Sequence, residues 1–336
     1  MIGARASQLY RFLTVAKIPR SWAHVLFAQQ LAAHRARLLI RAGYYFPALW
    51  MLSHTADWQR ISTPVHPDLL WPTAWLSFLD VHVAGPVLFW AAIAGASAGA
   101  VFSRFSSSRL LVFVCLLEFL SLKFSFGKIH HLMHAWLLVM FVWIFLPDGW
   151  QQAGGQTRSV QRRLLFLFGS AQFVAAMTYA LSGFGKLGGV VYQLARGEVT
   201  SLHPSALARH LAERLQQTGE TAPWGPWMIE HGHLFWPLML AVFYLQVFAV
   251  HLAARPQLHR LLGIGLVGFH VMSLLAMAID FTPAIPLLVL LFVLSPFAPS
   301  TDGGQLRAFS SAFEQLPLVP ALRGIKRRTR RSSAKR

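Results

Sequence analysis

The sequence predicts an all-α integral membrane protein, a polytopic helical bundle of about eight transmembrane helices with both termini in the cytoplasm. Three observations carry this prediction. Of the 336 residues, 55% are hydrophobic and 12% are charged, and the mean hydropathy is +0.48. A soluble globular domain carries about twice that share of charged residues. The apolar residues also gather in long runs, and most basic residues lie between those runs.

The lengths of the apolar runs give the number of helices. A hydrocarbon core of about 30 Å is crossed by roughly 17 to 25 residues of α-helix. Eight runs approach or reach this length, and they are residues 38–54, 82–102, 110–126, 131–147, 164–184, 234–253, 261–279 and 283–298. We therefore expect a basic N-terminal interfacial segment (1–36), a transmembrane domain (37–298) with an outer loop at 186–233, and a polybasic cytoplasmic tail (299–336).

The basic residues give the orientation. The formal net charge is +18, and placing both ends inside puts 23 of the 30 Lys and Arg residues on the cytoplasmic side. Cytoplasmic loops of membrane proteins carry such an excess. The N-terminus lacks the apolar region and small-residue cleavage site of a signal peptide, so we expect none. The sequence thus predicts a multi-pass protein of the plasma (inner) membrane.

Charge and cysteine content exclude other classes. The tail GIKRRTRRSSAKR is interpreted as a contact for anionic membrane lipid, because no groove-reading or aromatic element accompanies it. Nucleic acid is therefore not an expected partner. The one cysteine, Cys115, permits neither an intrachain disulfide nor a thiolate metal cluster.

Ionisable side chains at the ends of the runs are candidate site residues, because such groups are costly at membrane depth. The stretch SFGKIHHLMHAW brings Lys128, His130, His131 and His134 to the outer start of the fourth run. His131 and His134 are three residues apart, so they share one helix face. The alternative is an interfacial belt in which Lys128 reaches headgroup water.

Lys186 lies in a second such stretch, MTYALSGFGKLGG, at the outer end of the fifth run. Gly183 and Gly185 next to it allow another backbone or a flat ligand to come close. The alternative is a lysine that only anchors the helix end at the interface. The predicted topology puts this lysine and the His131–His134 pair on the same outer surface, as in a site at the mouth of a bundle.

Two further groups leave alternatives open. His270 lies near the middle of the seventh run, where it is either a cavity residue or a buried histidine bonded to a neighbouring helix. Glu230, His231 and His233 precede the sixth run and, with the histidines of the fourth, offer nitrogen and carboxylate ligands. The spacing is weak evidence, and we predict no metal. Glu118, inside the third run, requires a partner.

Three stretches, GKIHHLMH, ALSGFGKLGG and GLVGFHVMSLL, resemble the HTTM (horizontally transferred transmembrane) family, whose best-known members are the vitamin K-dependent gamma-carboxylases. The resemblance covers about residues 35–298. It puts Lys186 at the catalytic base and His131 at the family's histidine, and it implies that His134 is a second hydrogen-bonding partner. It further implies that Lys128, His130, Gly183, Gly185 and His270 surround the cofactor, a reduced quinone of the vitamin K hydroquinone type.

The resemblance implies quinol oxygenation coupled to modification of a substrate. A lysine can be the base only when its amine is neutral. The eukaryotic carboxylases carry a large soluble domain after the spans, whereas here a short basic tail follows the last apolar run, so we do not expect glutamate to be the substrate. The substrate is then unknown, either the quinol itself or a small, peptide or protein molecule supplied by a partner. The alternatives are a non-enzymatic transporter or accessory subunit of an export or maturation system, and a structural membrane subunit.

Overall fold

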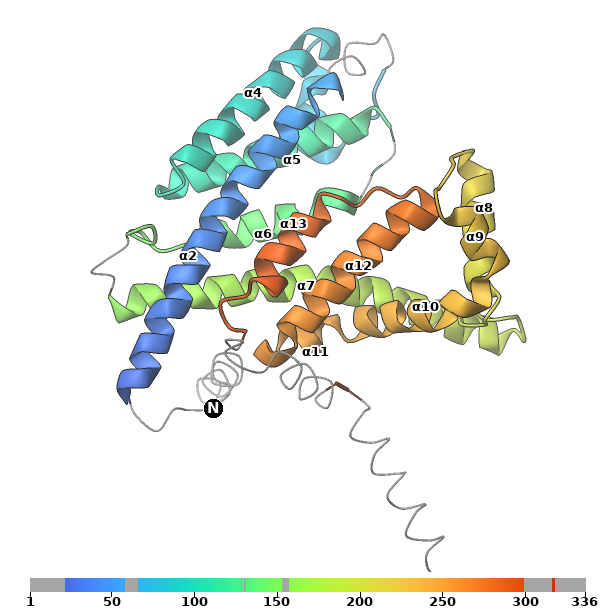
Figure 1. Ribbon diagram of the computed structural model, residues 1–336. Helices are drawn as coiled ribbons and strands as arrows, with labels where there is room; N and C mark the ends of the chain where they lie inside the picture. Colours follow the sequence, from blue (N-terminus) through green and yellow to red (C-terminus); the bar gives the residue numbers. More distant parts are fainter. Residues whose placement is uncertain are drawn as a thin grey trace, which may run out of the picture. The chain divides into compact units, whose positions relative to one another are not determined.

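The computed structural model describes residues 22–57, 66–127, 129, 131–152, 157–298 and 316–317, and these residues form helices and no β-strand (Figure 1). The all-α prediction is therefore confirmed for this part of the chain. Most of the predicted interfacial segment, nearly all of the predicted tail, Lys128 and His130 lie outside the described residues.

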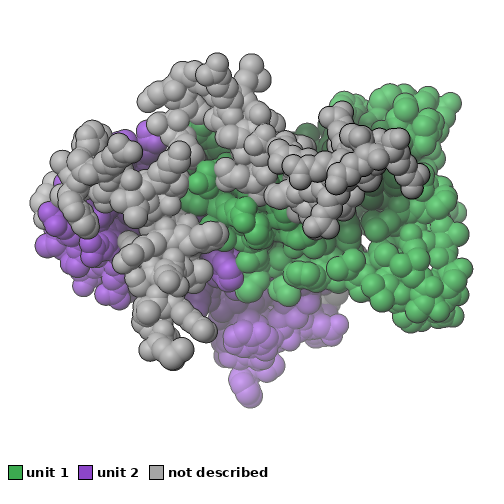
Figure 2. Space-filling view, turned by 90° about the horizontal axis from the view of Figure 1, so that it is seen from below, with its two compact units in different colours: residues 1–18, 176–279, 292–336 green, residues 19–175, 280–291 purple. Residues whose placement is uncertain are grey.

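The chain divides into two compact units (Figure 2). Among the described residues, unit 1 comprises 176–279, 292–298 and 316–317, and unit 2 comprises those from 22 to 175 together with 280–291. The long helix α7 (Arg158–Ala195) contributes its first half to unit 2 and its second half to unit 1.

Unit 2 is built on a set of closely packed helices. They are α2 (Trp22–Ser53), η1 (Thr55–Asp57), η2 (Trp71–Phe78), α4 (Val81–Val101), α5 (Ser106–Ser125), η3 (His131–Met133), α6 (His134–Ile144) and α13 (Ala284–Leu288), which runs on into the π-helical turn η5 (Val289–Val293). Gly95 and Gly99 let α4 approach α5, since a Cβ atom at Gly99 would lie 2.7 Å from Ser108 O and one at Gly95 2.6 Å from Cys115 Sγ. Small residues allow such close helix packing.

Arg109 fastens the ends of two helices in the core of unit 2. Its guanidinium donates to the carbonyl oxygens of Ile144 (3.1 Å), Ser103 (3.2 Å), Arg104 (2.9 Å) and Leu146 (2.6 Å). The last carbonyls of a helix have no partner within the helix. Arg109, with 1% of its surface exposed, satisfies two carbonyls after the end of α4 and two at or after the end of α6.

Unit 1 contains the second half of α7 and a series of shorter helices. They are α8 (Ala206–Thr218), α9 (Gly225–Glu230), α10 (Gly232–Val247), α11 (Ala249–Ala253), η4 (Pro256–Leu258) and α12 (His259–Met277). The polar stretch after α7 folds as the amphipathic helix α8, which buries Leu211 and ends at Gly219 in the left-handed conformation (φ 66°). Glycine is favoured at that position because it has no Cβ.

The structure supports the eight predicted spans in part. Each predicted run lies largely on helix, but within the described residues only three helices are long and apolar enough to cross a membrane: Val81–Val101, Arg158–Ala195 and Pro256–Met277. The apolar helices at 131–144, 232–247 and 284–293 are shorter. Helix α5 carries Arg109, Glu118 and Lys123, whose charges lower its apolar character. The number of spans and their sidedness therefore stay a prediction.

Candidate functional site

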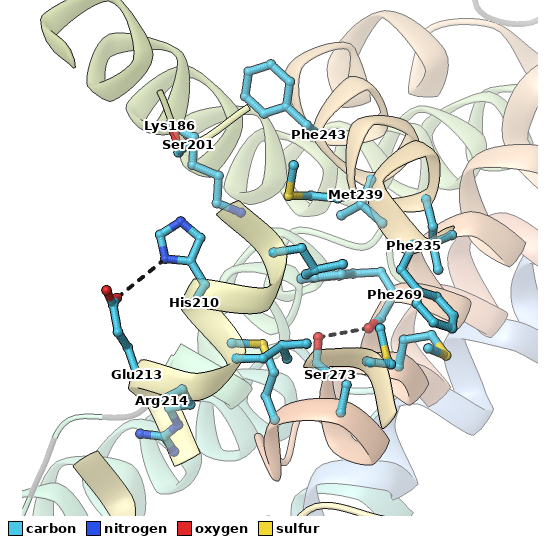
Figure 3. Close-up of a pocket in the computed structure, with 18 of the residues that line it drawn as sticks. Lys186, Ser201, His210, Glu213, Arg214, Phe235, Met239, Phe243, Phe269 and Ser273 are labelled. Atoms are coloured by element: carbon cyan, nitrogen blue, oxygen red, sulfur yellow. Dashed lines mark hydrogen bonds and ion pairs between the residues drawn. The ribbon is translucent and has the colours of Figure 1, made fainter. Parts of the chain in front are cut away.

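Unit 1 encloses a cavity of about 590 Å³ (Figure 3). Its walls come from α7, α8, α9, α10 and α12 and are mainly apolar. The apolar lining consists of Leu202, Leu207, Leu211, Met228, Phe235, Leu238, Met239, Val242, Phe243, Phe269, Met272, Ala276 and Met277. Its volume falls in the range of small-molecule sites, which typically combine apolar walls with a few polar groups.

Lys186 supplies an amine to this cavity. Figure 3 shows its side chain reaching from α7 toward the cavity. Its Nζ donates to Gln246 Oε1 at 2.6 Å and lies 5.9 Å from the centre of the Phe269 ring. Lys186 is exposed in the isolated chain, whereas Gln246 on α10 is 2% exposed. None of the ion pairs found in the described part of the chain involves Lys186. Its hydrogen-bonding partner is therefore a neutral amide.

Gly183 explains why Lys186 meets Gln246. A Cβ atom at Gly183 would lie 2.6 Å from Val247 N and 2.7 Å from Gln246 C, so the backbones of α7 and α10 are nearly in contact there. Lys186 follows three residues later on α7. Gly185 differs, because a Cβ atom there would meet no described residue within 4 Å. Of the two predicted glycines, only Gly183 makes a close backbone approach.

Helix α8 provides the polar edge of the cavity. His210, Glu213, Arg214 and Gln217 line it, together with Ser201 before the helix. His210 Nδ1 lies 3.8 Å from Glu213 Oε2, and Arg214 Nη2 lies 3.6 Å from Glu220 Oε2. The first contact lies within α8, and the second joins α8 to Glu220, which follows its end. The apolar side of α8 packs through Leu207 and Leu211 on Met228 and Ala276.

His270 lies beside the cavity wall rather than on it. It is buried in α12, and its Nε2 is 2.7 Å from the hydroxyl of Tyr179 on α7. The preceding residue, Phe269, lines the cavity. This geometry matches the alternative of a histidine bonded to a neighbouring helix, and its predicted role toward a cofactor stays a prediction.

His131 and His134 form a pair in unit 2. Their Nδ1 atoms are 2.9 Å apart and their ring centres 4.8 Å apart, so the predicted shared face is confirmed. Lys186 belongs to unit 1, so the histidine pair and the lysine lie in different units. The expected common mouth stays a prediction.

The other polar candidates have ordinary local partners. Glu118 Oε2 accepts a hydrogen bond from Trp75 Nε1 at 3.4 Å, which supplies the partner it was expected to need. His231 Nδ1 lies 3.1 Å from Trp227 O and 4.0 Å from Glu230 Oε2. In the described ranges, no three His, Cys, Asp or Glu side chains come together in a way that could hold a metal ion.

Two residues of the site were missed by the sequence reasoning. Gln246 is the one amide within the apolar run 234–253, so the rule that polar groups at membrane depth need an explanation could have found it. Phe269 gives no such signal, because a phenylalanine in an apolar run is indistinguishable from a packing residue.

Comparison of the chain with protein-family models, with curated proteins and with solved structures finds no match. The function is therefore inferred from the cavity geometry and the sequence pattern.

Proposed function

We propose that the chain is an HTTM-type membrane enzyme whose unit 1 cavity holds a reduced quinone, with Lys186 as the base that removes a proton from a ring hydroxyl. The observation that carries this proposal is an apolar cavity into which one amine projects, bonded to a neutral amide rather than to a carboxylate. The resemblance of the stretch around Lys186 to the family's base segment supports the same assignment.

The lining residues fit such a ring. Phe235, Phe243 and Phe269 offer aromatic surfaces, and the flexible thioether of Met239 adapts to irregular apolar shapes and contacts rings favourably. Lys186 and Gln246 are the groups that would meet the ring oxygens. The volume of the cavity leaves room for a ring and the beginning of an apolar chain.

The reduced quinone, when bound, would supply the electrons for reaction with oxygen and would itself be oxidised to the quinone. The part played by Lys186 is proton transfer: its neutral amine accepts a proton at Nζ through its lone pair. Gln246 Oε1 accepts one N–H of that amine and so orients the lone pair. A neutral partner also leaves the amine free to lose its charge, whereas a carboxylate would hold it as ammonium.

The membrane setting belongs to the proposal. In the part of the chain that the structure describes, three helices are long and apolar enough to span, and the distribution of basic residues favours a multi-pass protein of the plasma (inner) membrane with both ends in the cytoplasm. The roles implied for His131 and His134 as hydrogen-bonding partners, and a substrate supplied by a partner protein, are included as expectations of the resemblance.

The test uses the full chain in lipid nanodiscs, with two measurements on each variant: bound quinone after solvent extraction, and oxygen consumption with a short-chain naphthoquinol. Lys186→Arg keeps the charge but cannot act as a neutral base. We expect bound quinone to be retained and turnover to fall by at least about 100-fold, the lower range for general base catalysis.

The matched control is Lys123→Arg. Lys123 Nζ lies 5.2 Å from the centre of the Trp50 ring, a contact that arginine also makes, so its turnover is expected to stay near wild type. Unchanged turnover in Lys186→Arg would make Lys186 an interfacial anchor. Bound quinone without turnover in the wild-type chain would favour the non-enzymatic accessory or transport function.

A further inference from the structure

Helix η2 has one buried edge. A 3₁₀-helix has three residues per turn, so residues three apart lie on the same edge. Thr73 and Leu76 are spaced in this way, and both are fully buried. Eight residues is long for a 3₁₀-helix, which indicates that tertiary contacts hold it.

The contacts of the buried edge fix η2 to the end of α5. Leu70 N donates to Ser125 Oγ at 3.1 Å, and Asp68 N donates to Ser125 O at 3.0 Å. Within the first turn of η2, Thr73 Oγ1 donates to the carbonyl oxygen of Leu70 at 3.1 Å. The orientation of η2 on unit 2 is therefore set by hydrogen bonds, and its remaining edges face outward.

The outward edges carry Trp71, Trp75 and Phe78, and Leu79 follows directly after the helix; we call these four exposed side chains the aromatic row. Trp71 is 82% exposed and Phe78 is 87% exposed, and the other two are also exposed. Contiguous exposed apolar side chains of this size mark an interaction surface. The segment from 71 to 79 has no charged residue, and the one polar side-chain contact of the row, within the described residues, is the hydrogen bond from Trp75 Nε1 to Glu118 Oε2 in unit 2.

The surroundings of the row indicate what covers it. The chain continues from Leu79 into α4, one of the three candidate membrane spans, and exposed Val83, Val87 and Trp90 extend the apolar surface along that helix. Between the two, Asp80 caps α4 by accepting from His82 N at 2.9 Å. At about 2 Å per residue, η2 is only about 16 Å long, too short to cross a bilayer. Tryptophan is enriched where membranes meet water.

We propose that η2 is a membrane-surface anchor whose aromatic row lies in the headgroup region of a lipid bilayer. Its partner is the lipid surface, and the anchor fixes the depth of α4 in the membrane. This inference stands on unit 2 alone and does not depend on the proposed chemistry of Lys186.

The experiment places an environment-sensitive NBD probe on single cysteines. Cys115 is the only cysteine, so the background is Cys115→Ser, and Trp71→Cys and Phe78→Cys are labelled in separate full-length proteins in phosphatidylcholine–phosphatidylglycerol vesicles. Both side chains are more than four-fifths exposed, so their loss removes few contacts. Leu79→Cys is the substitute if either variant fails to fold. Asp148→Cys, at an exposed charged residue in the turn after α6, is the aqueous control.

We expect NBD at 71 and 78 to emit at shorter wavelength than at 148. We also expect a lipid nitroxide near the headgroup to quench the NBD fluorescence at least twofold more than a nitroxide near the end of the acyl chain. Aqueous iodide is expected to quench the NBD fluorescence little. Emission and iodide quenching equal to those at 148 would overturn the proposal, because the row would face water. Shielding from both iodide and lipid nitroxide would also overturn it, because protein would then cover the row.

Discussion

Arg109 in unit 2 and Lys186 in unit 1 have different kinds of hydrogen-bonding partner. In unit 2, Arg109 donates to four backbone carbonyls, and Trp136 and Tyr44 donate to the carbonyls of Pro283 and Trp143. In the cavity of unit 1, the amine of Lys186 donates to a side chain, that of Gln246. A backbone carbonyl moves only if its helix moves, whereas a side-chain partner can turn to a ligand. Both side chains are basic, so their charge does not distinguish them. The hydrogen-bonding partner does: backbone carbonyls hold Arg109 in a structural role, whereas the side-chain partner of Lys186 leaves its amine able to meet a ligand.

The largest expected effect tests the structural side of this comparison. Arg109→Ala removes the donor from four buried carbonyls, so we expect the free energy of unfolding to fall by about 3–5 kcal/mol. Chemical denaturation in detergent micelles measures it. The control is Arg104→Ala: this exposed guanidinium lies 4.4 Å over the Phe105 ring, and a change within about 0.5 kcal/mol is expected. A similar loss of unfolding free energy in both variants would show that the bonds from Arg109 to the backbone carbonyls have no special structural role.

The second prediction concerns the two glycines beside Lys186. Gly183→Ala brings a methyl group against the α10 backbone, so we expect a loss of about 1–3 kcal/mol in unfolding free energy, together with reduced turnover because Gln246 is displaced. Gly185→Ala meets open space, and alanine favours helix by up to about 1 kcal/mol. Thermal unfolding and turnover of both variants measure the difference. If Gly185→Ala lowered bound quinone at unchanged stability, Gly185 would contact the cofactor as the resemblance implies.

The smallest effect concerns the neutrality of Gln246. Gln246→Glu keeps an acceptor beside Lys186 but adds a charge that favours ammonium, so we expect turnover to fall about tenfold. Gln246→Leu removes only the orienting hydrogen bond, worth about 1 kcal/mol, and a fall of a few fold is expected. Turnover is compared at equal bound quinone. A fully active Gln246→Glu enzyme would show that Lys186 works while charged.

The sequence predicted the helical class because its apolar runs are long and nearly free of charge. Three of the eight expected spans are long and apolar enough within the described residues, whereas others are shorter, because hydropathy does not show where a helix ends, as α10 does at Val247. The lysine and the close approach of Gly183 were predicted from the ALSGFGKLGG stretch. Gln246 was not predicted, because its place beside the lysine depends on which helices pack together, and that packing has no local signal. His131 and His134 were predicted to share one helix face, and their Nδ1 atoms lie 2.9 Å apart.

Cys115 has a consequence for measuring the two units separately. Its thiol is buried between α4 and α5 against Gly95, and it is the only thiol in the chain. A thiol reagent can therefore react only when that helix pair opens, so the labelling rate under native conditions reports the opening equilibrium of unit 2. Loss of turnover reports unit 1 under the proposed function. Followed together in one warming experiment, the two signals give the order in which the halves of the chain lose their structure.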